Sequence, residues 1–440
     1  MNYKKTAIKI LTECSRLLIG VVFIFSGFVK AVDPVGGAIK IGDYLTSFGL
    51  DMLQPFTVLA SFALSAAEFA MGVCMLLGVY RRYNSFLVLL FMAFMTPLTL
   101  YLALFNPVSD CGCFGDAIVI SNWETFFKNL VLSAAAIMVF MNCGKMFQCF
   151  TYKVYWFVAL FSYFFCIGFA YWNYNHLPVL DFRPYKIGAN IPGLMSIPEG
   201  APEDEYKYTF VYEKEGVKKE FSLDDYPSDD STWTFVESKT ELIKKGYEPP
   251  VASFNIYDGE GDDVTGDILH NPQPVLLLIA PKLEKADDEK IDEINGVYDY
   301  ALEHELPFYC VTGSSPEMID EWSDNTGAEY PFRMADEVLL KTIIRSNPGL
   351  LLIKDGTILN KWSDNQLPDE YVLNDSLDKL ELGQQKQENK LHTIGYVLLW
   401  FIVPLTLVVG IDILIIKRRE RKSRERQAAQ SSDNRENDKL

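Results

Sequence analysis

The sequence predicts a polytopic α-helical membrane bundle of about six transmembrane helices, joined to an exported α/β domain. Hydrophobic residues make up 49% of the 440 positions, although the formal net charge is −18. The charge is uneven: residues 175–392 hold 20 Lys and Arg against 44 Asp and Glu, whereas the rest of the chain holds 20 against 14. This distribution indicates an acidic soluble body between apolar segments with basic edges. It argues against a nucleic-acid partner, which would require a basic surface.

Six segments are apolar enough to cross a bilayer, which requires roughly 20 mostly apolar residues. Five precede the acidic region and one follows it, at about 17–32, 56–80, 86–105, 126–142, 154–172 and 394–416. The first is short and could be a signal peptide, but no clear small-x-small cleavage site follows it, so a helix is favoured. The lipid bilayer is therefore the first partner that the sequence implies.

Basic residues mark the cytoplasmic side of a membrane protein. They precede the first span, join spans two and three, join spans four and five, and follow span six: Lys4, Lys5, Lys9, Arg16, Arg81, Arg82, Lys145, Lys153 and the stretch 417–426. If six spans alternate, these four segments share one face. We therefore expect both termini in the cytoplasm, the soluble domain in the periplasm or outside the cell, and a bacterial inner (cytoplasmic) membrane as the location.

The chain divides into six expected regions. They are a four-helix transmembrane domain (1–145), a fifth transmembrane helix (146–174), an exported extension (175–250), an α/β domain (251–384), a sixth transmembrane helix (392–416) and a basic, polar cytoplasmic tail (417–440), expected to be disordered. Within the extension, 201–250 has the pattern of a hairpin followed by more strand, and no chemistry is assigned to it.

The exported domain alternates strand and helix patterns, which favours βαβ units around a mixed sheet. "PVLLLIA" is a continuous apolar run fit for a buried strand, and Asp355-Gly356 marks a hairpin turn. A helix at 369–382 is expected to close the domain. The order βαβαββα, with Asn347-Pro348 leading into the hairpin, resembles the thioredoxin-like fold. That resemblance implies a cis-proline at Pro348, and a substrate groove that Pro348 and Asn347 line.

The domain departs from this family at its reactive site. Thioredoxin-like proteins carry C-x-x-C at the start of the first helix, where the helix dipole lowers a thiol pKa. Here the corresponding stretch is "LIAPKLEKADDEK", without cysteine. Cys310 falls within the second strand and is expected to be an inert core residue. The domain is therefore interpreted as a binding module, a docking surface or a degenerate relic.

The stretch "DCGCFGDAI" (110–118) places Cys111 and Cys113 on the exported face, where disulfides persist. A C-x-C disulfide closes a very small ring, and strained bonds tend to be labile or catalytic. Asp110 and Asp116 should disfavour a thiolate unless backbone amides or a helix start offset them. The alternatives are a structural disulfide, a tight turn with idle thiols, or a metal site. The last would need two further ligands, and since the four histidines lie in no ligand-like spacing, no metal is predicted.

The membrane segment carries a second resemblance. "RLLIGVVFIFSGFVKAVDP" (16–34) and "AAEFAMGVCMLLGV" (66–79) resemble helices of the DoxX family, and C-G-C-F-G resembles a stretch of the related methylamine-utilisation family MauE. The resemblance covers about residues 10–145. It implies a redox role at the outer membrane face, either maturation of a disulfide-rich exported protein or quinone-coupled sulfur oxidation, and so a quinone as cofactor.

Glu68 lies in the middle of the second span, where a carboxylate costs about 2.5–3.5 kcal/mol on insertion scales. It should face the bundle interior, neutral or paired, with Lys30 or Arg16 as partner. It is either a helix–helix hydrogen bond or a proton donor or acceptor near a quinone. Cys74 and Cys166 are expected to pack as small apolar residues, with a resolving thiol as the alternative for Cys166. Asp412 is expected to be solvated near the cytoplasmic edge.

Three functional hypotheses follow. In the first, Cys111 and Cys113 exchange disulfides with an exported thiol-containing protein and pass electrons to a membrane quinone, while Glu68 moves a proton. In the second, the chain is a non-catalytic scaffold whose exported domain binds an envelope partner. In the third, the bundle transports a small substrate.

Overall fold

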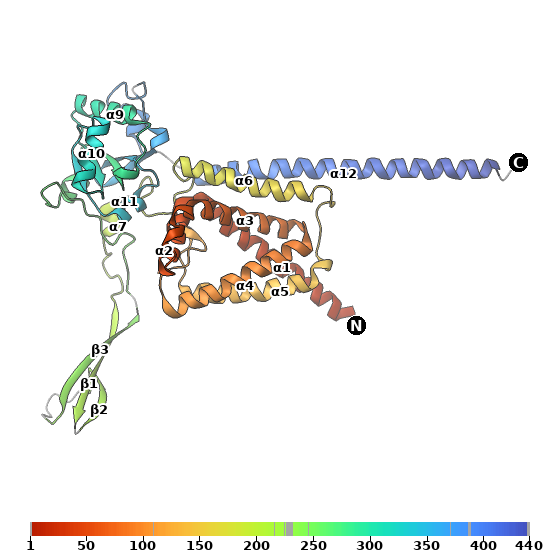
Figure 1. Cartoon of the computed structure of the whole chain (residues 1–440), viewed down its shortest axis with the longest axis horizontal. Helices are drawn as coiled ribbons and strands as arrows, with labels where there is room; N and C mark the ends of the chain where they lie inside the picture. The colour runs from red at the N-terminus through yellow and green to blue at the C-terminus, as the bar shows by residue number, and fades with distance from the viewer. Residues whose placement is uncertain are drawn as a thin grey trace.

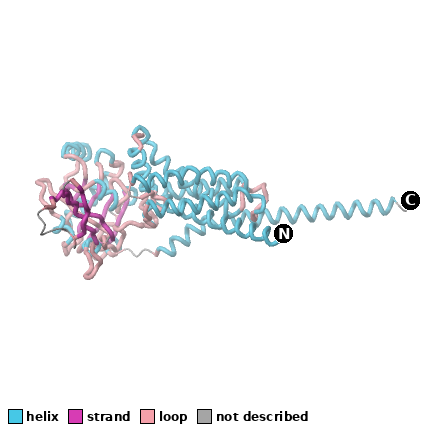
Figure 2. The backbone as a smooth tube through the Cα atoms, turned by 90° about the horizontal axis from the view of Figure 1, so that it is seen from below, coloured by secondary structure: helices cyan, strands magenta, loops and turns pink. Residues whose placement is uncertain are grey.

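Six helices in the described part of the chain are long and apolar enough to cross a membrane, which confirms the predicted spans. They are α1 (Asn2–Val32), α3 (Thr57–Leu77), α4 (Arg81–Phe105), α5 (Asn122–Asn142), α6 (Tyr155–Asn175) and α12 (Lys390–Asn437). This computed structural model describes residues 2–108, 110–214, 216–223, 225, 232–244, 246–369, 371–385 and 389–437. Both chain ends lie at the end of the bundle remote from the α/β domain (Figures 1 and 2).

Glycines allow α1 and α3 to pack closely. A Cβ atom added to Gly27 would lie 2.5 Å from the backbone nitrogen of Phe69, and one added to Gly72 would lie 2.6 Å from that of Ile24. Small residues let helix backbones approach one another, which is a main source of helix association in lipid. The close crossing brings Glu68 of α3 against α1.

A helix that the sequence analysis missed covers the outer end of the bundle. α2 (Pro34–Ser47) follows α1 directly and lies across the bundle end nearest the α/β domain (Figure 1). Asp33 is its N-cap, with Oδ1 accepting a hydrogen bond of 2.8 Å from the Gly36 amide, and Pro34 occupies the first helical position. Both are strong helix-start signals, but the following glycines weaken the helical pattern.

The exported domain is built on a five-stranded sheet in the order β6-β5-β4-β7-β8. Its strands are β4 (Val275–Ala280), β5 (Phe308–Thr312), β6 (Phe332–Met334), β7 (Gly349–Lys354) and β8 (Thr357–Ser363). The first three run parallel, β7 runs antiparallel to β4, and β8 runs antiparallel to β7. A cis Asn347-Pro348 bond precedes β7. This order, with a βαβ unit followed by a hairpin, is the thioredoxin-like arrangement that the sequence predicted.

Alternate residues of β4 enter two different cores, which explains its continuous apolar sequence. Leu276 and Leu278 pack on one side with α9 (Ile291–Glu303) and α10 (Pro316–Thr326). Leu277 and Ile279 pack on the other side with α11 (Glu337–Ile343). The sheet is therefore covered on both faces.

Two expectations about helices are wrong. The described residues of the segment 369–382 (369 and 371–382) form turns instead of a closing helix, because polar side chains bond to nearby backbone: Asp375 accepts from the Ser376 amide, and Asn374 donates to the Tyr371 carbonyl. The tail also differs from the expectation, since α12 continues as helix to Asn437.

The extension forms a separate three-stranded antiparallel sheet, in line with the predicted hairpin and additional strand. It contains β1 (Glu205–Lys214), β2 (Val217–Ser222) and β3 (Thr234–Lys244) in the order β2-β1-β3. This arm projects from the α/β domain, away from the helical bundle (Figure 1).

Candidate functional site

Cys111 and Cys113 lie in the loop between α4 and α5, outside the membrane spans. Both are free cysteines, each 8% exposed, and their sulfur atoms are 2.6 Å apart. Gly112 between them adopts φ +62°, a left-handed conformation that glycine accepts at little cost. The turn therefore brings the two sulfurs together on one side of the loop.

Neighbouring side chains hold this loop in place. Asp110 accepts a hydrogen bond of 2.9 Å from the Gly112 amide, and its other oxygen pairs with Lys40 of α2 at 2.7 Å. Tyr44, also on α2, donates its hydroxyl to the Cys111 carbonyl at 2.8 Å. The helix that the sequence analysis missed thus anchors the cysteine loop from the outside.

The two thiols differ in acidity. The contact with the Cys113 thiol is the largest influence on Cys111; together with the Thr125 hydroxyl and the Cys113 amide it outweighs burial and lowers the pKa of Cys111 to about 6. The same contact, with burial, raises the pKa of Cys113 well above its usual range. The lowered pKa makes Cys111 the candidate nucleophile of the pair.

Asp110 and Asp116, which were expected to disfavour a thiolate unless offset, each lie near a cation. Asp110 is paired with Lys40, and Asp116 lies 3.6 Å from the Arg345 guanidinium. Lys40 offsets the charge of Asp110, whereas burial and the neighbouring Asp33 raise the pKa of Asp116. The amide of Cys113, 3.3 Å from the Cys111 sulfur, is one of the backbone donors that the sequence argument required.

Glu68 lies directly beneath the cysteine loop, 3% exposed and paired with Lys30 of α1 at 2.7 Å. The Ser26 hydroxyl is 2.7 Å from both Glu68 Oε2 and the Cys113 carbonyl, and its single proton can serve one acceptor at a time. Of the two partners considered, Lys30 is thus the one found. Arg16 instead bonds to Glu13 and to the Met75 carbonyl.

A small cavity of about 30 Å³ lies beside Cys113, lined by residues that include Ser26, Glu68, Lys128 and Asn129. It has room for a water molecule or two, and is far below the roughly 300–1,000 Å³ of typical ligand pockets. It does not accommodate a quinone ring in this structure. The sequence analysis missed Lys128, although a lysine within an apolar span is a signal of the same kind as Glu68.

The residues expected to bind substrate in the exported domain lie apart from the cysteines. Asn347 donates to the Lys282 carbonyl at 2.8 Å, in the stretch where related proteins carry C-x-x-C. Asn347 also borders a cleft of about 400 Å³ between this domain and the bundle, lined in part by Val58 and Tyr174. Its Oδ1 is buried without a hydrogen-bond partner. The structure thus brings Cys111, Cys113 and Glu68 together, and places Asn347-Pro348 at a second site.

The other cysteines named in the sequence analysis, and Asp412, are buried away from the Cys111–Cys113 pair. Cys310 is fully buried in β5, and burial raises the pKa of its thiol. Cys74 and Cys166 are buried within α3 and α6. Asp412 is not solvated as expected, because it is buried and accepts hydrogen bonds from the amide and hydroxyl of Thr151. No group of three or more His, Cys, Asp or Glu residues within the described ranges is arranged to hold a metal ion.

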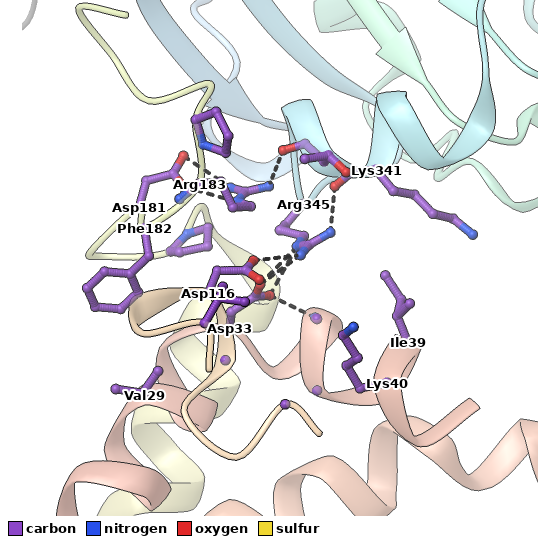
Figure 3. A pocket seen from close by; sticks show the side chains of 18 of the residues that line it. Val29, Asp33, Ile39, Lys40, Asp116, Asp181, Phe182, Arg183, Lys341 and Arg345 are labelled. Atoms are coloured by element: carbon purple, nitrogen blue, oxygen red, sulfur yellow. Dashed lines mark hydrogen bonds and ion pairs between the residues drawn. The ribbon is translucent and has the colours of Figure 1, made fainter. Parts of the chain in front are cut away.

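A larger cavity of about 860 Å³ lies above the cysteine loop, between the bundle and the exported domain (Figure 3). Arg345, just after α11, points into this region and bridges the two parts of the molecule. It donates to both oxygens of Asp33 at 2.9–3.1 Å and approaches Asp116 of the cysteine loop.

These features define a multi-span membrane protein with a thioredoxin-like α/β domain and a paired-cysteine site in a loop between two spans. Residues 8–142 match the family model described as Methylamine utilisation protein MauE, which confirms that resemblance for the first four spans. The DoxX resemblance is not shown and stays an expectation. Residues 206–245, in the arm, match a family described as Domain of unknown function (DUF8463).

No curated protein matches the chain. One matching solved structure is the solution structure of a protein described as a protein disulfide isomerase from Bacteroides thetaiotaomicron. It is 16% identical, its match covers 27% of this chain and 77% of that chain, and its TM-score is 0.22. That likeness is too slight to indicate an activity.

Proposed function

We propose that this chain is a redox-associated membrane protein that performs thiol–disulfide exchange with exported thiol-containing proteins at Cys111 and Cys113. The observation that carries the proposal is the contact between the two free, buried sulfurs, 2.6 Å apart within one turn. A pair poised in this way has a nucleophile and a resolving group in one turn. The MauE-type membrane domain supports a redox role.

In the oxidising direction, a partner thiolate attacks the Cys111 sulfur of the closed pair. The Cys111–Cys113 bond breaks, a mixed disulfide forms, and Cys113 leaves and is protonated. A second partner thiolate then attacks the partner's own sulfur in the mixed disulfide, and Cys111 leaves. The partner loses two electrons and the pair gains them. The low pKa of Cys111 suits it to be the final leaving group, since thiols of lower pKa leave faster.

The cycle would close if the dithiol passed two electrons and two protons to a membrane quinone, forming a quinol and restoring the disulfide. Glu68 would move one of these protons, through Ser26 or directly. Burial of Glu68 beneath Cys113 and its hydrogen bond with Ser26 support this role. The 30 Å³ cavity means that a quinone would have to meet the pair after a rearrangement of the loop.

The proposed location is a bacterial inner membrane, with both termini cytoplasmic and the cysteine loop on the exported face. The basic residues that flank the spans support this orientation. The position of both chain ends at one end of the bundle is consistent with it.

The experiment is thiol trapping on the full-length chain in intact cells with an alkylating mass tag. Wild type should show Cys111 and Cys113 shifting between free and oxidised forms as the supply of quinone changes. The Cys113→Ser variant should accumulate mixed disulfides between Cys111 and exported proteins. A pair that stays reduced under every condition would contradict the proposal. The matched Cys74→Ser variant, altered at a buried thiol in α3, should behave as wild type.

A second candidate is a non-catalytic scaffold that binds an envelope partner. It is favoured by the exported domain itself, whose only cysteine, Cys310, is fully buried in the sheet. In this case, the full-length chain should capture the same partner in wild type and in a Cys111→Ser, Cys113→Ser variant. Loss of capture in the double variant would point back to exchange.

A further inference from the structure

The cavity above the cysteine loop combines four segments from distant parts of the chain. Its lining comes from the end of α1 and α2, from the cysteine loop, from the linker 178–186, and from α11 with Arg345 (Figure 3). At about 860 Å³ it has the size of a pocket for a ligand of several functional groups. It is larger than either of the two sites described above that border Cys113 or Asn347.

The floor of this cavity is the turn that holds the pair. Gly112, between the two cysteines, lines the cavity together with Asp110 and Gly115. The stem of Lys40 lies over Gly112, since a Cβ added there would be 3.2 Å from Lys40 Cγ. Lys40 is partly exposed and is held by one ion pair to Asp110. The partly exposed Lys40 side chain therefore covers Gly112 on the cavity side of the turn.

The charges inside the cavity are largely compensated by one another. Arg345 is paired with Asp33, Arg183 with Asp181, and Lys40 with Asp110. The walls between these pairs are apolar and come from both domains: Val29, Ile39, Val119, Leu180, Phe182 and Val338. The exposed charges Asp43 and Lys186 are of opposite sign. Counted together, the lining holds six basic and five acidic side chains, so it has little net charge to select an anionic or cationic small thiol, and its apolar walls suit a largely apolar ligand.

We infer that this cavity is the docking site for a cysteine-bearing, apolar segment of an exported polypeptide, which reaches the Cys111–Cys113 turn across Gly112. The inference rests on the proposed function and names its substrate class. Displacement of the Lys40 side chain opens the way to the turn, and the exported domain supplies the α11 wall and the Arg345 bridge. This gives the thioredoxin-like domain, which lacks the C-x-x-C motif, a binding role at a reactive site that lies in another domain.

The test uses the full-length Cys113→Ser chain in nanodiscs, so that mixed disulfides at Cys111 persist. Two probes carry the same activated aromatic disulfide, one on a short apolar cysteine peptide and the other on N-acetylcysteine. Mass spectrometry of the digested chain counts the adduct at Cys111 alone, because other cysteines are exposed. Val338→Trp fills the cavity from the α11 wall, and Val217→Trp on β2 of the arm is the matched control.

We expect Val338→Trp to lower the ratio of peptide rate to small-probe rate roughly tenfold, because a blocked site loses the oriented encounter. Val217→Trp should keep the wild-type ratio. As a second variant, Phe182→Ala should raise the peptide concentration needed for half-maximal rate without changing the maximal rate.

The remaining outcomes are decisive as well. If Val338→Trp slows both probes equally, the cavity serves small disulfides and the polypeptide assignment is wrong. If neither variant changes the peptide reaction, the segment approaches by another path and the inference fails. If neither probe reacts at Cys111 in the chain that carries only Cys113→Ser, the proposed exchange function itself fails. That outcome is distinct from a failure of the docking site alone.

Discussion

Lys30 and Glu68 form a buried ion pair of 2.7 Å between α1 and α3, immediately beneath the Cys113 carbonyl to which Ser26 bonds. The pair neutralises a carboxylate that would otherwise be costly inside the bundle. It also connects the packing of the spans to the geometry of the cysteine turn.

Removing one member of this pair should destabilise the bundle. Lys30→Met leaves the Glu68 carboxylate buried without a counter-ion, and breaking a buried pair in this way costs about 3–5 kcal/mol. The melting temperature in detergent should therefore fall. The double variant Lys30→Met, Glu68→Leu should recover most of that loss, because no buried charge remains. Equal stability of the single variant and wild type would mean that the pair contributes nothing.

The acidity of Cys111 should appear in its alkylation rate. The rate should rise with pH around a midpoint of about 6, because only the thiolate reacts. In Cys113→Ala the largest stabilising hydrogen bond is gone, so the midpoint should move up toward the ordinary cysteine value of about 8.5. An unchanged midpoint in that variant would show that Cys113 does not set the acidity.

The same lowered pKa predicts a pH dependence of stability. A thiolate that is stabilised only in the folded chain contributes stability that is fully present above the unfolded pKa, about 8.5, and is lost as pH falls through about 6. The difference in melting temperature between wild type and Cys111→Ala should therefore shrink between pH 8.5 and pH 6. Cys74→Ala, at a buried thiol in α3, is the control and should show no such trend.

The Arg345 bridge should hold the exported domain against the bundle. Arg345 is 8% exposed on its side chain and donates to both oxygens of Asp33. Charge-assisted hydrogen bonds of this kind contribute about 1.5–3 kcal/mol. In Arg345→Ala, hydrogen exchange should increase at 33–47 and around the cysteine loop. Lys379→Ala, which breaks an exposed pair with Asp375, should change little, since solvent screens such pairs.

Close packing of α1 on α3 makes Gly27 intolerant of any side chain. Gly27→Ala places a Cβ 2.5 Å from the Phe69 backbone nitrogen, so the helices must separate, and overpacking costs about 1–3 kcal/mol. Gly168→Ala on α6 has nothing within 4 Å of the added Cβ. It should be neutral or stabilising by up to about 1 kcal/mol, from helix propensity. Melting in detergent compares the two, and a similar response at both positions would contradict the packing argument.

The order of spans, strands and hairpin could be predicted from the sequence because each of these elements requires a distinct pattern of apolar residues. A span must satisfy its backbone internally and present apolar side chains to lipid, and a two-sided strand such as β4 must be apolar throughout. The helix predicted over 369–382 was wrong, since side chains there form local hydrogen bonds to the backbone that compete with the helix. Helix α2 was not predicted because its glycines weaken the periodic pattern of apolar residues.

The sequence alone determined that a C-x-C pair between two spans and a mid-span carboxylate at Glu68 are the chemically unusual residues of this chain. Only the tertiary structure decided that they form one site, because Ser26 and the Cys113 carbonyl meet across 87 positions of the chain. The same holds for the different acidities of Cys111 and Cys113, which arise from a through-space contact of two sulfurs. A sequence shows which residue types are present and how they are spaced. Burial and hydrogen bonds between distant segments decide the acidity and the contacts of those residues.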